Sequence, residues 1–228
     1  VPKISDILLR SSDELNLFDT PLMLSRNIGL SIEQRWIKRA EDIIIASLML
    51  VLFSPIFLIA SAAIKLYDGG PVFYRQTRVT LNGKKFDIFK FRSMIVDAEK
   101  DGKSQPAADK DPRITPVGRV LRATRLDELP QLIDIFVGNM SLVGPRPERV
   151  EHVEKYTDEL PEFEYRLKVR GGLTGYAQIY GKYNTTPYDK LQLDLIYIQN
   201  YSILLDLRLL LMTIKIMFMK ESTEGFTE

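Results

Sequence analysis

The apolar stretch at residues 43–64 constrains this chain more than any other feature, because it contains no charged side chain. As one continuous helix it would extend about 33 Å, which is enough to cross the hydrocarbon core of a bilayer. Ser54 and Pro55 interrupt the stretch near its middle. A proline there removes one backbone donor and clashes with the carbonyl of Val51, so the sequence predicts a break at this point.

Basic residues flank the stretch on both sides. They are Arg35, Lys38 and Arg39 before it and Lys65, Arg75 and Arg78 after it. Because positively charged flanks stay in the cytoplasm, this pattern favours a re-entrant hairpin over residues 36–66 that enters and leaves by the same face. The hydroxyl of Ser54 would help to satisfy the carbonyls that the break frees. A single transmembrane helix and a buried core helix remain the alternatives.

The composition narrows the chemistry. The chain has 228 residues, which suits one compact domain with attachments, and its net charge of +1 favours neither nucleic acid nor an acidic partner. It has no cysteine, which excludes thiolate chemistry, and its single histidine, His152, disfavours serine–histidine and histidine-rich metal mechanisms. Active groups are therefore expected among Asp, Glu, Lys, Arg, Tyr and hydroxyl side chains.

Two adjacent carboxylates, Asp127 and Glu128, precede a helix that Pro130 starts. Apolar residues then recur at helical spacing, which predicts one buried face. They are Leu129, Leu132, Ile133 and Phe136. Asp127 stands where an N-cap would, and capping alone would explain an aspartate at this position.

Arginines nearby favour a second interpretation of this carboxylate pair. Arg122, Arg125 and Arg146 are expected around the helix start, where free backbone amides already attract anions. Such a site can bind phosphate, hold a metal ion and present a carboxylate nucleophile. The arginines should also keep Asp127 ionised.

Two short strands are expected at residues 72–76 and 85–92, joined around Asn82-Gly83, which is a strong hairpin signal. Alternation places Lys90 and Arg92 on one face of the second strand. There they could contact phosphate, although charges on a solvated strand edge are an equally good explanation.

Residues 97–112 are polar and aperiodic and predict a mobile loop. It contains Asp109-Lys110-Asp111, which matches the Asp-x-Asp metal signature of many nucleotide-sugar glycosyltransferases, although an ordinary solvated loop is the favoured explanation. Near the C-terminus, residues 189–201 predict a helix with Leu191, Leu195 and Ile198 inward. Residues 203–219 predict an apolar helix at a membrane interface, favoured over a buried core helix.

Ordered motifs across residues 36–220 resemble those of the bacterial sugar transferases, the monotopic polyprenol-phosphate phosphoglycosyl transferases. The motifs are Lys38-Arg39, Ser54-Pro55, Gly70-Pro71-Val72-Phe73, Lys90-Phe91-Arg92-Ser93-Met94, Asp111-Pro112-Arg113-Ile114-Thr115, Asp127-Glu128-Leu129-Pro130-Gln131-Leu132, Gly144-Pro145-Arg146-Pro147, Val169-Arg170-Gly171-Gly172-Leu173-Thr174-Gly175 and Asp194-Leu195 with Tyr197-Ile198 and Asn200. One departure is Gly171, where many relatives are expected to have proline.

The resemblance implies transfer of a sugar-1-phosphate from a nucleoside diphosphate sugar, expected to be a UDP-sugar, to polyprenol (undecaprenyl) phosphate. It implies Asp127 as the nucleophile of an aspartyl-phosphosugar intermediate and Glu128 as the ligand of Mg²⁺. Phosphate-binding and further active-site roles are implied for five other residues. They are Lys90, Arg92, Arg122, Arg146 and Asp194.

The expected fold class is α/β, dominated by helices with a small strand element and associated with the membrane. Residues 1–35 are expected to be a linker from an upstream region, residues 36–66 the re-entrant hairpin, and residues 67–228 a catalytic domain on the cytoplasmic face of the bacterial inner membrane. Membrane lipid and a second copy of the chain are further candidate partners, and no nucleic acid is expected. Two other hypotheses stay open, a metal-dependent glycosyltransferase and a noncatalytic membrane-tethered nucleotide-binding domain.

Overall fold

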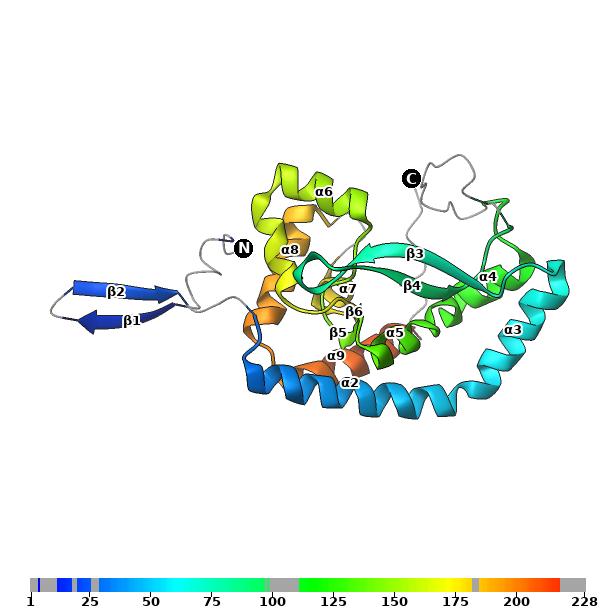
Figure 1. The fold of residues 1–228 in the computed structure, drawn as a ribbon, viewed down its shortest axis with the longest axis horizontal. Coiled ribbons are helices and arrows are strands. Elements are labelled where there is room, and N and C mark those ends of the chain that lie inside the picture. Colours follow the sequence, from blue (N-terminus) through cyan, green and yellow to red (C-terminus); the bar gives the residue numbers. More distant parts are fainter. Residues whose placement is uncertain are drawn as a thin grey trace.

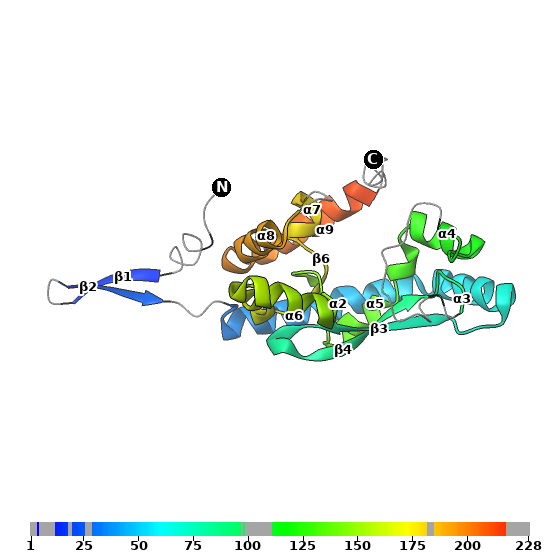
Figure 2. The same cartoon turned by 90° about the horizontal axis from the view of Figure 1, so that it is seen from above.

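Helices dominate the architecture, and short two-stranded sheets lie among them (Figure 1). The computed structural model describes residues 4, 12–17, 20–25, 29–96, 98, 111–181 and 185–217. A β-hairpin of β1 (Ser12–Leu17) and β2 (Thr20–Ser25) lies within the expected linker and projects away from the other elements in Figures 1 and 2. The helix-dominated α/β class predicted from the sequence is therefore confirmed.

The apolar stretch forms two helices that meet at the predicted break. Helix α2 (Ile32–Leu52) starts at a capping box between Ser31 and Gln34, and α3 (Ser54–Asp68) follows at an angle of 60°. The Ser54 hydroxyl donates to the carbonyl of Val51 at 2.8 Å, as expected for a serine beside a proline break. Within the described residues no single helix is long and apolar enough to cross a membrane, whereas this bent pair meets that test by length and composition.

The predicted strand pair is confirmed as β3 (Phe73–Val79) and β4 (Lys85–Phe91), which pair antiparallel with Tyr74 opposite Lys90. The chain reverses in a short 3₁₀ turn, η1 (Leu81–Gly83). Asn82 and Gly83 have φ values of 55° and 74° there, which is the left-handed conformation that Asn-Gly turns supply.

Helix α5 (Gln131–Val137) packs under this hairpin, but not on the face expected from the sequence. Leu132 and Ile135 are fully buried, whereas Phe136 is 47% exposed, so the prediction that Phe136 faces the core is wrong. The reason is Asp134, which is buried and accepts a 2.9 Å hydrogen bond from the backbone N–H of Phe89 in β4. This polar contact turns the helix, and the pKa of Asp134 rises to about 6 because of its burial.

A parallel strand pair and the C-terminal helices complete the core. Strands β5 (Ser141–Val143) and β6 (Gly172–Thr174) pair near the middle of the molecule. The remaining elements are α4 (Pro116–Ala123), η2 (Leu126–Glu128), α6 (Val150–Glu159), η3 (Pro161–Lys168), α7 (Tyr176–Tyr180), α8 (Pro187–Gln199) and α9 (Ile203–Met217). Leu191, Leu195 and Ile198 of α8 are buried, as predicted.

Helix α9 is oriented with its polar stripe inward. Asp206 is 1% exposed and pairs with Lys38 of α2, and Thr213 bonds the hydroxyl of Thr174 at 2.7 Å. The exposed surface of the helix is mainly apolar, although Arg208 and Lys215 are exposed as well. It carries Leu204, Leu207, Leu211 and Ile214, all exposed. Figures 1 and 2 show that the start of α9 lies against the start of α2, where the buried ion pair joins them.

Candidate active site

A short 3₁₀ turn, η2, presents the two adjacent carboxylates. Arg125 enters the turn in the left-handed conformation, with φ 55° and ψ 16°, and α5 begins only at Gln131. Pro130 occupies the position before α5, and no side chain caps this helix. The expectation that Asp127 is an N-cap is therefore wrong, because the 3₁₀ turn separates its carboxylate from the amides of α5.

Glu128 is held by two cations from distant parts of the chain. Its Oε1 accepts from Lys90 Nζ of β4 at 2.7 Å and from Arg146 Nη2, in the segment after β5, at 2.8 Å. Burial opposes ionisation, but Arg146 and Lys90 outweigh it and hold the pKa of Glu128 well below its usual range. Glu128 is consequently ionised at any physiological pH.

Asp127 behaves in the opposite way although it is the next residue. Burial, and then the negative charge of Glu128, raise its pKa, while Lys90 and Arg122 only partly offset this. Arg122 does favour the ionised form of Asp127, as expected, but burial and Glu128 outweigh it in the net direction of the pKa. A group that is harder to ionise is more basic, which favours reaction with an electrophile once further cations approach.

Asp127 lines a cavity of about 390 Å³ with five cationic side chains, which we call the cationic cavity. They are Arg78, Lys90, Arg92, Arg122 and Arg149. The structure therefore brings together four of the residues singled out in the sequence, and Glu128 and Arg146 join them through Lys90. Arg125 is exposed and is not among the lining residues. Lys90 is paired with Glu128. Arg92 is paired with Asp68. With these pairs counted, the cations around the cavity still exceed the carboxylates and leave positive charge for an anionic ligand.

Arg92 offers donors to such a ligand. The side chain is 7% exposed, and its Nη2 pairs with Asp68 at the end of α3. Its Nε and Nη1 are buried and have no hydrogen-bond partner among the described residues. Because unpaired buried donors are costly, these two atoms favour a bound acceptor such as a phosphate oxygen.

The first strand of the hairpin supplies one further cation, Arg78, whose place in the site sequence reasoning missed. Tyr74, Gln76 and Arg78 line the cavity from β3, on the same face as Lys90. Burial, and then the charge of Arg146, lower the pKa of Arg78 to about 10. Period-two alternation along β3 was the signal that could have identified Arg78, because it applies to both strands of the pair.

Close packing positions Arg122 in the last turn of α4. The Thr115 hydroxyl caps this helix by accepting from Gly118 N–H at 2.9 Å. A Cβ on Gly118 would lie 1.9 Å from the carbonyl oxygen of Ser93, so only glycine allows α4 to approach the end of the hairpin this closely.

Asp194 lies behind the cavity rather than on its wall. It is 1% exposed and accepts from Arg166 Nε at 2.9 Å, and Arg166 Nη2 in turn donates to the carbonyl of Arg146 at 2.9 Å. Asp194 therefore fixes the backbone that presents Arg146 to Glu128. Glu148 adds to this support, because it accepts a hydrogen bond from Lys190 at 2.6 Å. The sequence did not reveal this role of Glu148.

A magnesium ion fits this site only together with phosphate oxygens. The described residues contain no group of three Asp, Glu or His side chains that could hold a metal ion alone. Both cations bound to Glu128 donate to Oε1, so Oε2 is the oxygen that can approach a metal. Magnesium commonly binds with one or two carboxylates, waters and substrate phosphates, which matches this donor set.

The Asp-x-Asp alternative has a different environment. Asp109 and Lys110 lie outside the described residues. Asp111 accepts from Arg113 Nη2 at 2.6 Å, and hydrogen bonds from Arg113 lower the pKa of Asp111 to about 2. Its carboxylate is therefore already paired with an arginine, as expected of a structural aspartate.

This arrangement of adjacent carboxylates, cations and a bent apolar helix pair agrees with the sequence comparisons. Residues 33–220 match the family model described as bacterial sugar transferase. The chain belongs to this family, as the resemblance predicted.

Curated relatives show the same relationship. A UDP-glucose:undecaprenyl-phosphate glucose-1-phosphate transferase of Klebsiella pneumoniae is 42% identical over 220 residues, which cover 92% of this chain and 45% of the relative. A UDP-N-acetylgalactosamine-undecaprenyl-phosphate N-acetylgalactosaminephosphotransferase of Aeromonas hydrophila is 42% identical over 183 residues, 79% of this chain and 43% of the relative. The chain thus spans less than half the length of these two proteins.

A shorter relative is matched over most of its length. The exopolysaccharide production protein ExoY of Sinorhizobium fredii is 40% identical over 191 residues, which cover 78% of this chain and 83% of the relative.

Proposed function

We propose that this chain transfers a sugar-1-phosphate from a UDP-sugar to undecaprenyl phosphate and so initiates the assembly of a bacterial glycan. The observation that carries the proposal is the cationic cavity, in which five cations face the single carboxylate of Asp127. The names of the relatives support the same donor and acceptor classes. Because equally similar relatives are named for glucose and N-acetylgalactosamine, the proposal specifies the class of sugar donor rather than one sugar.

The reaction proceeds in two displacements at one phosphorus atom. An oxygen of Asp127 attacks the sugar-linked phosphorus, the bond from this phosphorus to the bridging oxygen breaks, and uridine monophosphate leaves with that oxygen. An oxygen of undecaprenyl phosphate then attacks the same phosphorus and expels the aspartate. Both nucleophiles are anions, so neither step requires a general base, and the aspartate is regenerated.

The cations of the cavity make the first attack feasible. A carboxylate and a diphosphate repel each other, and Lys90, Arg92 and Arg122 offset that repulsion at the site of attack. Burial has already raised the pKa of Asp127, so the arriving diphosphate meets a basic nucleophile. Arg146, held by Arg166, keeps Glu128 ionised and in place.

Mg²⁺ is proposed as the cofactor, with Glu128 Oε2 as its protein ligand. When bound, it supplies charge neutralisation for the diphosphate and the leaving group. Asp194 contributes through Arg166 and has no direct contact with the substrate in this mechanism.

Membrane association and a site on the cytoplasmic face of the inner membrane are part of the proposal. The bent α2–α3 pair exposes apolar side chains along its length, and α9 turns a further apolar face outward. On α2 and α3 they include Ile44, Leu48, Val51, Leu52, Leu58 and Ile59. We infer a re-entrant placement at the headgroup level, where the phosphate of the lipid acceptor lies.

Identifying the released nucleotide tests the reaction. The detergent-solubilised chain is mixed with UDP-sugar, Mg²⁺ and undecaprenyl phosphate, and the products are separated. We expect uridine monophosphate. Uridine diphosphate would instead indicate a glycosyltransferase, and an Asp127→Asn variant with unchanged output would indicate a noncatalytic nucleotide-binding role for this carboxylate.

A further inference from the structure

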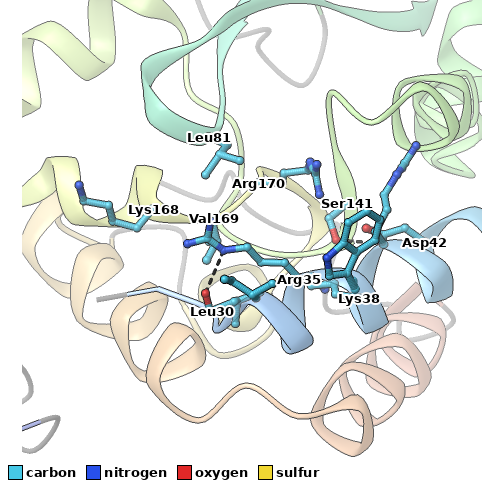
Figure 3. Close-up of a pocket in the computed structure, with 12 residues that line it drawn as sticks. Leu30, Arg35, Lys38, Asp42, Leu81, Ser141, Lys168, Val169 and Arg170 are labelled. Atoms are coloured by element: carbon cyan, nitrogen blue, oxygen red, sulfur yellow. Dashed lines mark hydrogen bonds between the residues drawn. The ribbon is translucent and has the colours of Figure 1, made fainter. Parts of the chain in front are cut away.

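A second pocket lies at the start of α2 and shares no lining residue with the cationic cavity. We call it the α2 pocket. Its volume is about 350 Å³, which is within the range of small-molecule sites. Figure 3 shows Arg35 of α2 and Arg170, from the segment before β6, on its walls, with Asp42 nearby.

The α2 pocket has an excess of positive charge. Five cations line it against one carboxylate, Asp42. They are Arg35, Lys38, Arg39, Lys168 and Arg170. Lys38 forms an ion pair with Asp206. Arg39 donates to the carbonyls of Ile135 and Phe136 at the end of α5.

The remaining two arginines, Arg35 and Arg170, form no ion pair with a described residue. Within the described part of the chain, no carboxylate lies at ion-pair distance from Arg35 or Arg170. Arg35 Nε donates to the carbonyl of Leu30 at 2.9 Å, as the dashed line in Figure 3 shows. Burial, and then the like charge of Arg39, lower the pKa of Arg170. Asp42 only partly offsets this, and Arg35 lowers the pKa further. An anion between these guanidinium groups would relieve that repulsion.

Apolar side chains at the rim indicate the kind of anion. Ile32 and Trp36 line the α2 pocket and are each 73% exposed. The same helix continues into the apolar stretch, with Ile44 and Leu48 exposed beyond them. Tryptophan beside cations at the start of an apolar helix is typical of the headgroup level of a bilayer. A ligand that combines phosphate with acyl chains would satisfy both sets of residues.

We propose that the α2 pocket binds the phosphodiester headgroup of an anionic glycerophospholipid, between Arg35 and Arg170, with the acyl chains along α2. This inference rests on the membrane placement in the proposed function but not on its chemistry. The bound lipid would fix the depth of α2, and through the Lys38–Asp206 pair that of α9.

Trp36 is the only tryptophan of the chain and therefore reports directly on this pocket. The full chain is reconstituted in phosphatidylcholine vesicles that contain a minor fraction of brominated phosphatidylglycerol or of brominated phosphatidylcholine, which quench tryptophan on contact. We expect brominated phosphatidylglycerol to quench Trp36 at a much lower fraction of the total lipid than brominated phosphatidylcholine does. Arg35→Gln with Arg170→Gln should reduce this preference about 30-fold, at about 1 kcal/mol for each cation.

The matched control removes two exposed lysines outside both cavities, Lys85→Gln with Lys155→Gln, and should keep the preference. Arg35→Lys with Arg170→Lys retains both charges, so this variant should keep part of the preference for phosphatidylglycerol. It keeps the proposal testable if the neutral variant folds poorly. Asp127→Asn should bind the lipid normally, which separates this test from that of catalysis. The proposal is overturned if the neutral variant keeps the full preference for phosphatidylglycerol. It is also overturned if inorganic phosphate abolishes that preference by occupying the pocket equally well. A third contradicting result is that the arginine substitutions change only the self-association of the chain and not the quenching of Trp36.

Discussion

Buried charge serves different ends in two regions of this molecule. Between α2 and α9, Lys38 and Tyr197 both donate to Asp206, so this buried carboxylate is paired with a cation. In the cationic cavity, five cations line the wall together with one carboxylate, that of Asp127. The paired charges join α2 to α9, whereas the excess positive charge around the cationic cavity favours binding of an anionic substrate.

The neighbouring carboxylates repeat this contrast on a smaller scale. Glu128 has two cationic partners and a lowered pKa, whereas the pKa of Asp127 is raised. The paired residue is suited to hold a metal ion and the unpaired residue is suited to react. If the contrast is correct, substitutions in the two regions should separate loss of turnover from loss of stability.

The largest expected effect is on turnover. Asp127→Asn keeps the size of the side chain but removes the proposed nucleophile, so we expect a fall in kcat of about 10⁴-fold or more. Nucleotide-sugar binding should be retained. The measurement is formation of lipid-linked sugar, with Asp158→Asn on the exposed surface of α6 as the matched control.

Breaking the Lys38–Asp206 pair should affect stability instead. Lys38→Met leaves Asp206 buried without its cation, and we expect the free energy of unfolding to fall by about 3–5 kcal/mol. The double variant with Asp206→Leu should recover much of this loss, because both charges are removed together. Denaturation in detergent measures both, and Lys215→Met at an exposed position of α9 serves as control.

Removing one cation from the cavity should slow the reaction and shift its pH dependence. Arg122→Gln is expected to lower kcat about 10²–10³-fold. Because Arg122 lowers the pKa of Asp127, its loss should raise that pKa further and move the acid limb of kcat/KM to higher pH. An unchanged acid limb would show that a group other than Asp127 controls it.

The smallest expected effect concerns Glu148, behind the cavity. Arg166 and Lys190 outweigh burial and lower its pKa from 4.5 to about 2, so its contribution is present above pH 4.5 and lost as the pH falls toward 2. This contribution is about 3 kcal/mol. Glu148→Gln should therefore be less stable than the unsubstituted chain at neutral pH, and the difference should narrow on acidification.

The sequence predicted those features that depend on local chemistry. The break at Ser54-Pro55 follows from a proline in an apolar helix, and the strand hairpin follows from Asn82-Gly83. The family resemblance, rather than local chemistry, implied that Lys90, Arg92, Arg122 and Asp127 lie together, and they line one cavity.

Other features depend on contacts between distant residues, and the sequence did not reveal them. The face of α5 is set by Asp134 bonding a strand 45 residues away, which overrides the apolar spacing that favoured Phe136. The inward polar stripe of α9 depends on Lys38, which is 168 residues from Asp206. Likewise, the pKa of Asp127 reflects burial, which arginines nearby in sequence cannot reveal.

Intact-protein mass spectrometry tests the central claim most directly. The chain is mixed with UDP-sugar and Mg²⁺ in the absence of undecaprenyl phosphate. Our account predicts a mass increase of one sugar phosphate less water, located at Asp127, absent from Asp127→Asn, and discharged when undecaprenyl phosphate is added. Lipid-linked product formed at the normal rate by protein that never carries this mass increase would contradict it.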